Sequence, residues 1–184
     1  HLPAIRTDHM RIILASDFQT QPWKNGGGIT HEIARKDEGD SLLWRLSIAE
    51  VSSDGPFSAF TGLSRILTVI DGAGLWLDTP QGRLDALPLK PLPFSGDLPV
   101  SSRMIDGPIR DFNLIFNGAR LTGSVEHVTS AQTLPGAPGR QYALLALSDD
   151  ANVDIAKLPK GSVVLFDEAT IYASHAFLVQ LDLR

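Results

Sequence analysis

Hydrophobic and polar residues alternate over short stretches along most of the chain, which is the period-two pattern of β-strands. Gly, Pro, Asp and Ser separate these stretches at intervals of roughly 8–12 residues, the spacing typical of all-β proteins. Sixteen glycines and twelve prolines argue against long helices. The pattern therefore predicts an all-β fold with very little helix. The predicted strands are Arg11–Leu14, Gly28–Ala34, Leu42–Val51, Ser64–Ile70, Gly74–Leu77, Gln81–Leu87, Val100–Met104, Asp111–Phe116, Leu121–His127, Gln141–Leu147, Asn152–Ala156, Ser162–Phe166 and Ala176–Leu183.

Three of these strands place polar residues two positions apart, so that both side chains share one face. The pairs are Thr30 and Glu32, Arg45 and Ser47, and Asp111 and Asn113. Short polar groups mixed with arginine suit the interior of a small barrel that holds a ligand. The alternative is the solvated outer face of an antiparallel sheet.

The segment 23–33 combines an aromatic residue, a cation, an amide, a carboxylate and three consecutive glycines. Three glycines in a row are entropically expensive, so they indicate an unusual turn or a close backbone approach. Alternation resumes at Ile29. We therefore predict a glycine turn that leads into a strand whose second face is polar.

Composition excludes several classes of protein. The formal charge of −5 and a pI near 5.4, without a basic patch, argue against a nucleic-acid partner. The absence of cysteine excludes disulfides, thiolate zinc sites and cysteine nucleophiles, and fits a reducing cytoplasm. No apolar run approaches the roughly 18 residues that span a bilayer, and no secretory signal is visible. We expect a cytoplasmic protein with no membrane partner.

Catalytic and metal motifs are weak. Outside a segment that we interpret as an expression-tag remnant (1–9), the histidines are His31, His127 and His175, without a His-X-His pair. We therefore predict no metal site and no cofactor. No phosphate loop or nucleophile elbow is present. The catalytic residues stay unknown, and Glu32 and Asp111 are the candidates for a general base.

Arg45 is the polar residue whose partner matters most, because a buried cation is costly unless it is paired. Its planar guanidinium group can donate two parallel hydrogen bonds to a ligand carboxylate. The alternative is an internal salt bridge with Asp111 or Glu32. Aromatic residues can wall the pocket: Trp23, Trp44, Phe57, Phe60 and Phe94.

Several of these segments together resemble the HutD/Ves family. The segments are 22–34 (PWKNGGGITHEIA), 44–51 (WRLSIAEV), 55–60 (GPFSAF), Arg65, 72–74 (GAG), 93–97 (PFSGD) and 111–113 (DFN). The resemblance covers most of the chain from Met10 to about Val128. It implies a bicupin, that is, two small β-barrels of double-stranded β-helix type in one chain, typically without metal-binding histidines. Residues 10–129 would form the N-terminal cupin portion, 130–140 a linker, and 141–184 the remaining cupin strands.

The resemblance also implies a function. Family members are found with genes for histidine utilisation and are thought to bind N-formyl-L-glutamate or a related intermediate, as a governor of the pathway. The candidate ligand-binding residues are Trp23, Lys24, Asn25, Thr30, Glu32, Arg45, Ser47, Phe57, Ser58, Phe60, Arg65, Asp111 and Asn113. The family often carries a basic residue shortly after the last of these. Here Asn117 and Gly118 stand there, and Arg120 is the nearest substitute.

Two other functions remain open. One is a metal-independent enzyme, an isomerase, hydrolase or lyase, that uses Glu32 or Asp111 as general base. The other is a structural interaction protein whose polar face is plain surface. We expect a small acidic metabolite as partner. A homodimer is a further possibility, through an edge strand such as Arg11–Leu14.

Overall fold

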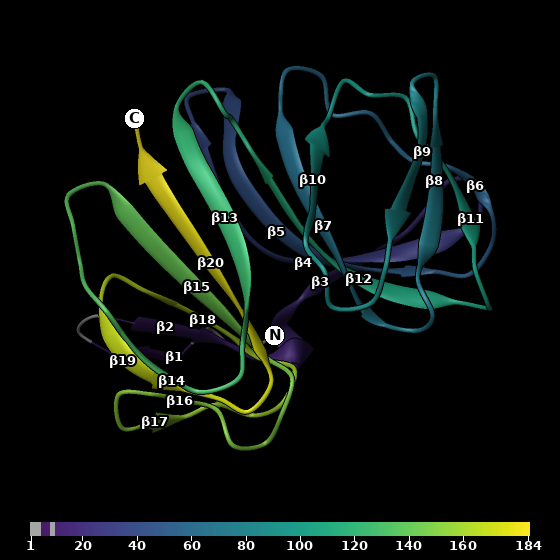
Figure 1. The fold of residues 1–184 in the computed structure, drawn as a ribbon. Coiled ribbons are helices and arrows are strands. Elements are labelled where there is room, and N and C mark those ends of the chain that lie inside the picture. The colour runs from purple at the N-terminus through teal and green to yellow at the C-terminus, as the bar shows by residue number, and fades with distance from the viewer. Residues whose placement is uncertain (1–4, 8–9) are drawn as a thin grey trace. The chain divides into compact units, whose positions relative to one another are not determined.

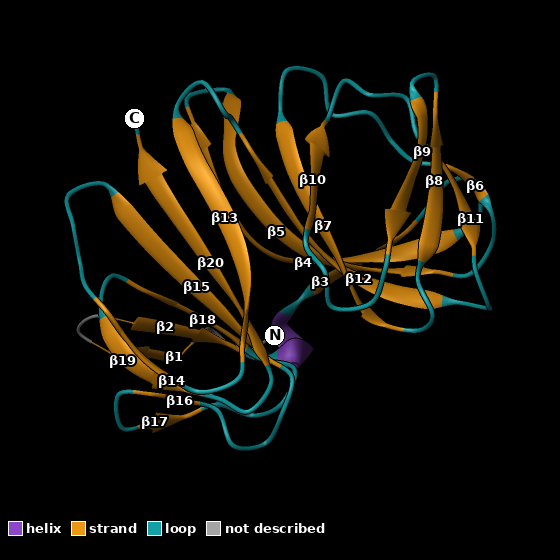
Figure 2. Cartoon of the chain, viewed as in Figure 1, coloured by secondary structure: helices purple, strands orange, loops and turns teal. Residues whose placement is uncertain are grey.

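The computed structural model describes residues 5–7 and 10–184, which are almost entirely β-strands joined by short loops (Figure 2). The chain divides into two compact units. One comprises residues 19–118, and the other combines residues 1–18 with residues 119–184. No helix in the described part of the chain is long and apolar enough to cross a membrane.

The 19–118 unit consists of two antiparallel sheets (Figure 1). Its six-stranded sheet has the order β10-β7-β12-β5-β4-β3, and its four-stranded sheet has the order β6-β11-β8-β9. In chain order the strands are β3 (Gln19–Pro22), β4 (Gly28–Glu38), β5 (Ser41–Val51), β6 (Gly55–Pro56), β7 (Ser64–Asp71), β8 (Leu75–Thr79), β9 (Gly82–Ala86), β10 (Leu92–Ser95), β11 (Ser101–Met104) and β12 (Ile109–Phe116).

Apolar side chains from both sheets form the core of this unit. Leu67 and Val69 of β7 pack in one cluster with Leu75 and Leu77 of β8, and all four are at most 1% exposed. Alternation explains this, because every second residue of each strand points to the same side of its sheet. Phe57 is partly buried against the same cluster.

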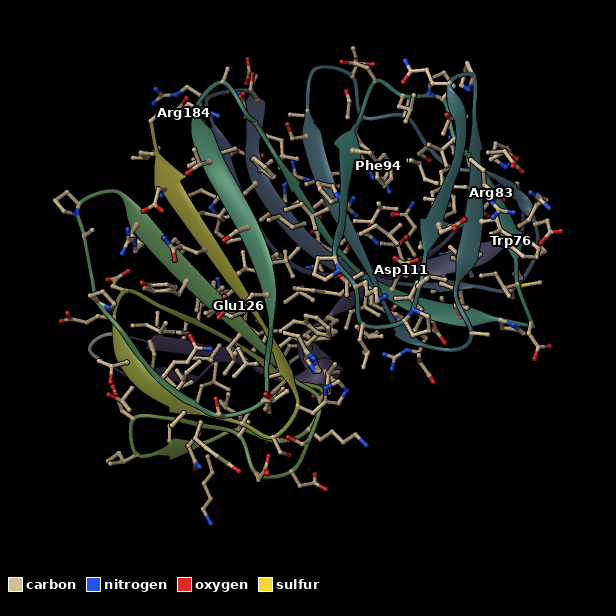
Figure 3. The ribbon with its side chains drawn as sticks, in the orientation of Figure 1. Trp76, Arg83, Phe94, Asp111, Glu126 and Arg184 are labelled. Carbon is tan, nitrogen blue, oxygen red and sulfur yellow. The ribbon has the colours of Figure 1, made fainter. Side chains whose placement is uncertain are left out.

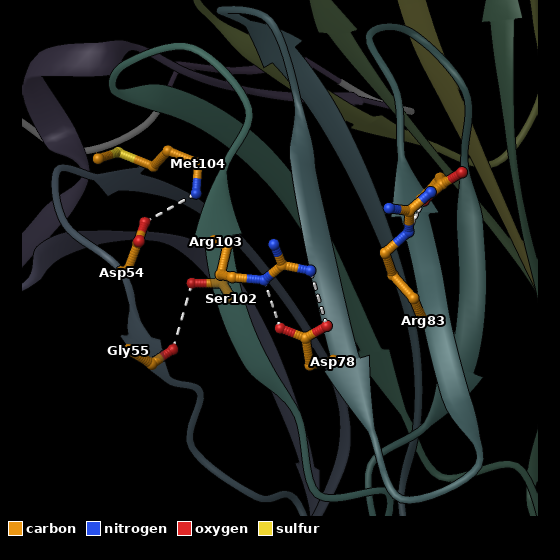
Figure 4. Close-up of polar contacts among 8 residues, drawn as sticks. Asp54, Gly55, Asp78, Arg83, Ser102, Arg103 and Met104 are labelled. Atoms are coloured by element: carbon orange, nitrogen blue, oxygen red, sulfur yellow. Dashed lines mark hydrogen bonds and ion pairs between the residues drawn. The ribbon is translucent and has the colours of Figure 1, made fainter.

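Side-chain bonds hold the segment before β7 against the four-stranded sheet (Figure 4). Ser102 donates its hydroxyl hydrogen to the carbonyl oxygen of Gly55 at 3.2 Å, and Asp54 accepts a hydrogen bond from the backbone N–H of Met104 at 2.8 Å. This attachment positions Phe57, which follows directly in the chain.

The second unit also contains one six-stranded and one four-stranded antiparallel sheet among its described residues. Their orders are β1-β2-β18-β15-β20-β13 and β14-β19-β16-β17. The strands are β1 (Ile5–Thr7), β2 (Met10–Ile13), β13 (Leu121–Val128), β14 (Ala131–Leu134), β15 (Arg140–Ala146), β16 (Asn152–Val153), β17 (Ala156–Lys157), β18 (Val163–Phe166), β19 (Ala169–Tyr172) and β20 (Ala176–Leu183). A 3₁₀ turn, Ala15–Asp17, follows β2.

Large apolar side chains fill the interior of this second unit. Tyr142 and Phe166 are each 1% exposed and stack with ring centroids 5.3 Å apart. The hydroxyl of Tyr142 donates to the carbonyl oxygen of Pro135 at 2.8 Å, so its polar end is satisfied.

The all-β prediction is confirmed, and each predicted strand region contains a strand, although Asn152–Ala156 is split into β16 and β17. Alternation did not reveal β3, β6, β10, β14 or β19, which are at most four residues long. Strands this short are hard to detect because they offer only two or three positions per face.

The division of the chain differs from the predicted one. It falls at 18/19 and 118/119, and the segment 130–140, predicted as a linker, lies inside the second unit and contains β14. Of the segment interpreted as a tag remnant, Ile5–Thr7 forms β1, while residues 1–4 and 8–9 lie outside the described part. The suggestion of a free edge at Arg11–Leu14 is wrong, because β2 pairs with both β1 and β18.

Candidate functional site

A cavity of about 620 Å³ lies in the 19–118 unit. It falls within the size range of small-molecule sites. Of the predicted ligand-binding residues, all except Glu32 line it. The lining residues are Gln21, Pro22, Trp23, Lys24, Asn25, Thr30, Arg45, Ser47, Ala49, Pro56, Phe57, Ser58, Phe60, Arg65, Asp111, Asn113 and Ile115.

Strand register explains why these residues meet. Across β5, β12 and β7, Ser47 pairs with Asn113, and Asn113 pairs with Leu67. One step along the same face, Ile115 pairs with Arg45 on one side and with Arg65 on the other. The predicted polar faces of β5 and β12 thus form one continuous surface with β7, and this surface faces the cavity. Of the polar pair predicted on β4, Thr30 lines the cavity and Glu32 does not.

Arg65 is the most unusual group in the cavity. Its side chain is 6% exposed, and its guanidinium carbon lies 4.8 Å from the ring centroid of Phe94, 5.2 Å from that of Phe60 and 5.7 Å from that of Phe57. Its hydrogen bonds are long, at 3.4 Å to the carbonyl oxygen of Ser58 and 3.5 Å to Oδ1 of Asn113.

The charge of Arg65 is therefore only weakly compensated. Its Nε is buried without a hydrogen-bond partner, and it forms no ion pair within residues 5–7 and 10–184. Burial lowers the pKa of Arg65 to about 10, and the field of Asp111 opposes this change. The guanidinium remains charged near neutral pH and has hydrogen-bonding capacity available to a ligand.

Asp111 is the carboxylate of the cavity, and it is 1% exposed. Asn113 joins it to Arg65: the amide Nδ2 of Asn113 donates to Oδ1 of Asp111, while the amide Oδ1 accepts from Arg65. This amide orientation is unambiguous because arginine only donates. Burial raises the pKa of Asp111 to about 7, although the bond from Asn113 and the charge of Arg65 act to lower it.

Arg45 forms the internal salt bridge that sequence analysis had left open, and its partner is Glu32. The Nε–Oε1 distance is 2.7 Å, and both side chains are about one-fifth exposed. Arg35 also approaches Glu32, at 3.6 Å. Glu32 does not line the cavity, and its carboxylate forms ion pairs with both arginines. It is therefore a weaker candidate than Asp111 for a general base.

The glycine turn forms one wall of the cavity, as the loop of the hairpin between β3 and β4. Gly26 takes a φ of +75°, and its N–H donates to the carbonyl oxygen of Trp23 at 3.1 Å. At Gly28, a Cβ would lie 2.9 Å from the indole ring of Trp23, so only glycine lets the ring pack there. The indole N–H donates to Oγ1 of Thr30 at 2.8 Å, and Asn25 caps the turn through the N–H of Gly27.

A second family segment, 93–97, supports the opposite wall. The N–H of Phe60 donates to the carbonyl oxygen of Gly96 at 2.9 Å, and the N–H of Gly96 donates to that of Leu63 at 2.7 Å. Asp97 accepts from the N–H of Gly62 at 2.9 Å. These bonds position the loop that carries Ser58 and Phe60. In Figure 3, Phe94 and Asp111 lie within this unit, whereas Trp76 and Arg83 lie at its outer side.

Five lining residues lie outside the predicted set, and two residues predicted as walls, Trp44 and Phe94, do not line the cavity. Ala49 and Ile115 continue the predicted polar faces by one alternation step, so the pattern itself contained that signal. Trp44 was predicted as a possible wall, but it pairs with Phe116 on the opposite face of the sheet. Neither Asn117, Gly118 nor Arg120 lines the cavity.

The sheets and the internal cavity define an all-β, cupin-like protein. A bacterial pirin from Escherichia coli, solved in complex with nickel(II), shows the same fold: the TM-score is 0.69 at 7% identity, with 95% of this chain and 98% of that chain covered. The chain belongs to the HutD family, whose model matches residues 15–182. This family is associated with histidine utilisation.

Two relatives are much closer in sequence. HutD from Pseudomonas fluorescens SBW25, solved in a formate condition, is 35% identical, with a TM-score of 0.87 and with 95% of this chain and 99% of that chain covered. An uncharacterized 21.2 kDa protein encoded in the hutC 3′ region of Pseudomonas putida is 36% identical over 162 residues, which is 86% of this chain and 84% of that protein.

The described residues that line the cavity do not match a cupin metal centre. No histidine lines the cavity, and Asp111 is its carboxylate. Within the described ranges, no group of three or more His, Asp or Glu side chains is placed to hold a metal ion. His127 and His175 form a hydrogen-bonded pair in the second unit, with 2.7 Å between Nε2 of His127 and Nδ1 of His175.

Proposed function

We propose that this protein binds a small acidic metabolite in the cavity of the 19–118 unit. The ligand would be N-formyl-L-glutamate or another intermediate of histidine degradation, and its binding would regulate histidine utilisation in the cytoplasm. The observation that carries the proposal is Arg65, a buried guanidinium that lines the cavity without an ion-pair partner. A carboxylate is the natural partner of such a group.

The other lining groups are consistent with this ligand. Arg65 and Lys24 supply two cationic sites, one buried and one exposed, for a ligand with two carboxylates. Asn25 and Ser47 add neutral hydrogen-bonding groups that suit a formamide. Association with histidine utilisation supports the choice of an acidic amino-acid derivative as the ligand.

Isothermal titration of chelator-treated protein with N-formyl-L-glutamate tests the proposal, with L-glutamate and urocanate as controls. We expect saturable heat with the formylated compound. Arg65→Met keeps an apolar stem inside the phenylalanine cage and should abolish that heat. Arg83→Met, an exposed arginine outside the cavity, is the matched control and should bind like the wild type. Equal binding by both variants would refute the role of Arg65.

Arg45→Ala provides a graded comparison. Because Glu32 already neutralises Arg45, this variant should weaken binding less than Arg65→Met does. A larger loss in Arg45→Ala would mean that the ligand displaces Glu32, and that Arg45 rather than Arg65 is the principal anion partner.

One observation favours a second function, a metal-independent isomerase, hydrolase or lyase. A pKa near 7 suits Asp111 to general acid–base catalysis near neutral pH. Turnover of urocanate, formiminoglutamate or formylglutamate, lost in Asp111→Asn and with a pH–rate inflection near 7, would support this function. An absence of turnover with all three would count against it.

A further inference from the structure

The net charge that the cavity offers to an anion depends on whether Asp111 is ionised. The lining residues carry three cations, Lys24, Arg45 and Arg65, and one carboxylate, Asp111. Arg45 is neutralised by Glu32 at 2.7 Å. When Asp111 is ionised, it balances Arg65, and the buried part of the site has no net charge to offer an anion.

Among the described residues, Arg65 is the charged group whose field acts on the pKa of Asp111. Lys24 and Arg45 also line the cavity, but Arg45 stands opposite Ile115 rather than Asp111, and Glu32 does not line the cavity. The lining residues of 56–60 are uncharged. His31 is hydrogen-bonded to Glu50 and does not line the cavity.

We infer that an anionic ligand enters this cavity together with one proton, which is held on the carboxyl group of Asp111. The inference rests on the proposed function, and it specifies how that function responds to pH. A protonated Asp111 no longer competes for Arg65, and its hydroxyl can donate a hydrogen bond to the ligand. An ionised Asp111 would instead add a further negative charge to a buried site beside the anionic ligand, which is costly.

Two properties of the site support this coupling. Asn113 bonds to both Asp111 and Arg65, so the carboxyl group and the guanidinium belong to one hydrogen-bonded chain. Burial already raises the pKa of Asp111 to about 7, and an anion nearby would raise it further. The pKa of Arg65, about 10, leaves that group charged at pH 8, so it takes up no proton there.

The experiment is a titration of wild-type protein with N-formyl-L-glutamate at pH 8, in HEPES and in Tris, and at pH 6, in MES and in Bis-Tris. These buffers differ in heat of ionisation, so the difference in observed heat counts the protons taken up. We expect about one proton per ligand at pH 8 and close to none at pH 6. Affinity should be about tenfold lower at pH 8.

Asp111→Asn, a neutral mimic of the protonated acid, supplies the second arm. It should take up no proton and should bind about tenfold more tightly than the wild type at pH 8. A merely structural role for Asp111 predicts weaker binding instead. Asp78→Asn removes an exposed carboxylate outside the cavity, so it should keep the wild-type proton count.

The outcomes separate the two proposals. Heat of binding without proton uptake at pH 8 would refute this inference and leave the proposed function intact. No heat at either pH would refute the proposed function, and the inference would fall with it. Because the proton count is measured on the wild type, it decides the matter even when Asp111→Asn does not fold.

Discussion

Gly96 supports the cavity wall in a way that one substitution can test. In Gly96→Ala, the new Cβ would lie 2.2 Å from the carbonyl oxygen of Phe60 and 2.8 Å from that of Leu63. Real Cβ atoms do not approach backbone oxygens this closely. A backbone oxygen cannot move like the end of a flexible side chain, so the loop between Phe57 and Leu63 must shift.

Gly96→Ala should lower the free energy of unfolding for two reasons. A shift weakens two backbone hydrogen bonds, from the N–H of Phe60 to Gly96 at 2.9 Å and from the N–H of Gly96 to Leu63 at 2.7 Å. Each contributes about 1 kcal/mol net, and overpacking adds about 1–3 kcal/mol. We expect the free energy of unfolding to fall by about 3–5 kcal/mol. For a unit of this size, that lowers the melting temperature by at least about 10 °C.

Scanning calorimetry and urea denaturation measure this change. Gly136→Ala is the matched control, because its new Cβ meets first the flexible end of the Glu168 side chain, at 3.2 Å. That variant should change stability by less than about 0.5 kcal/mol. Equal melting temperatures for Gly96→Ala and Gly136→Ala would refute the reasoning. Gly96→Ala should also weaken ligand binding, since the shifted loop carries Ser58 and Phe60.

Three further predictions concern single groups. Thr30→Val keeps the side-chain shape but leaves the indole N–H of Trp23 without its acceptor, so urea denaturation should show a loss of about 1 kcal/mol. Tyr142→Phe removes a buried hydroxyl that donates to a backbone carbonyl and should cost about 1–2 kcal/mol, whereas the more exposed Tyr172→Phe should be within about 0.5 kcal/mol of wild type. Asp111 binds more protons in the folded than in the unfolded state between about pH 4 and 7, so its contribution makes stability fall as pH rises through that window. The rise in the pKa of Asp111 from 3.8 to about 7 corresponds to roughly 4 kcal/mol in the free energy of unfolding. The stability of Asp111→Asn relative to the wild type should therefore grow up to pH 7 and then level off. A stability difference that does not depend on pH would contradict the raised pKa.

Local patterns were enough to predict the longer strands and most of the cavity lining, but not β3, β6, β10, β14 and β19, which have four residues or fewer. The alternation that places Asp111 and Asn113 on one face is a property of any extended chain, whatever it pairs with. The three glycines of the segment 23–33 also indicated a close backbone approach, but not the strand that makes it: a Cβ at Gly28 would lie 2.5 Å from the carbonyl oxygen of Glu50 on β5. The alternation depends on residues close together in the sequence, so tertiary structure did not change it.

Tertiary structure decided the partners. β4 and β12 both lie beside β5, but Glu32 stands opposite Ser47, near Arg45, whereas Asp111 stands opposite Ala49, so Glu32 pairs with Arg45. Phe94 reaches Arg65 because β10 pairs with β7. The unit boundary likewise follows from β2 pairing with β18, some 150 residues later. Such contacts depend on which strands lie side by side. Hydrophobic alternation determines the face of each side chain, but the packing of the whole chain determines its neighbours.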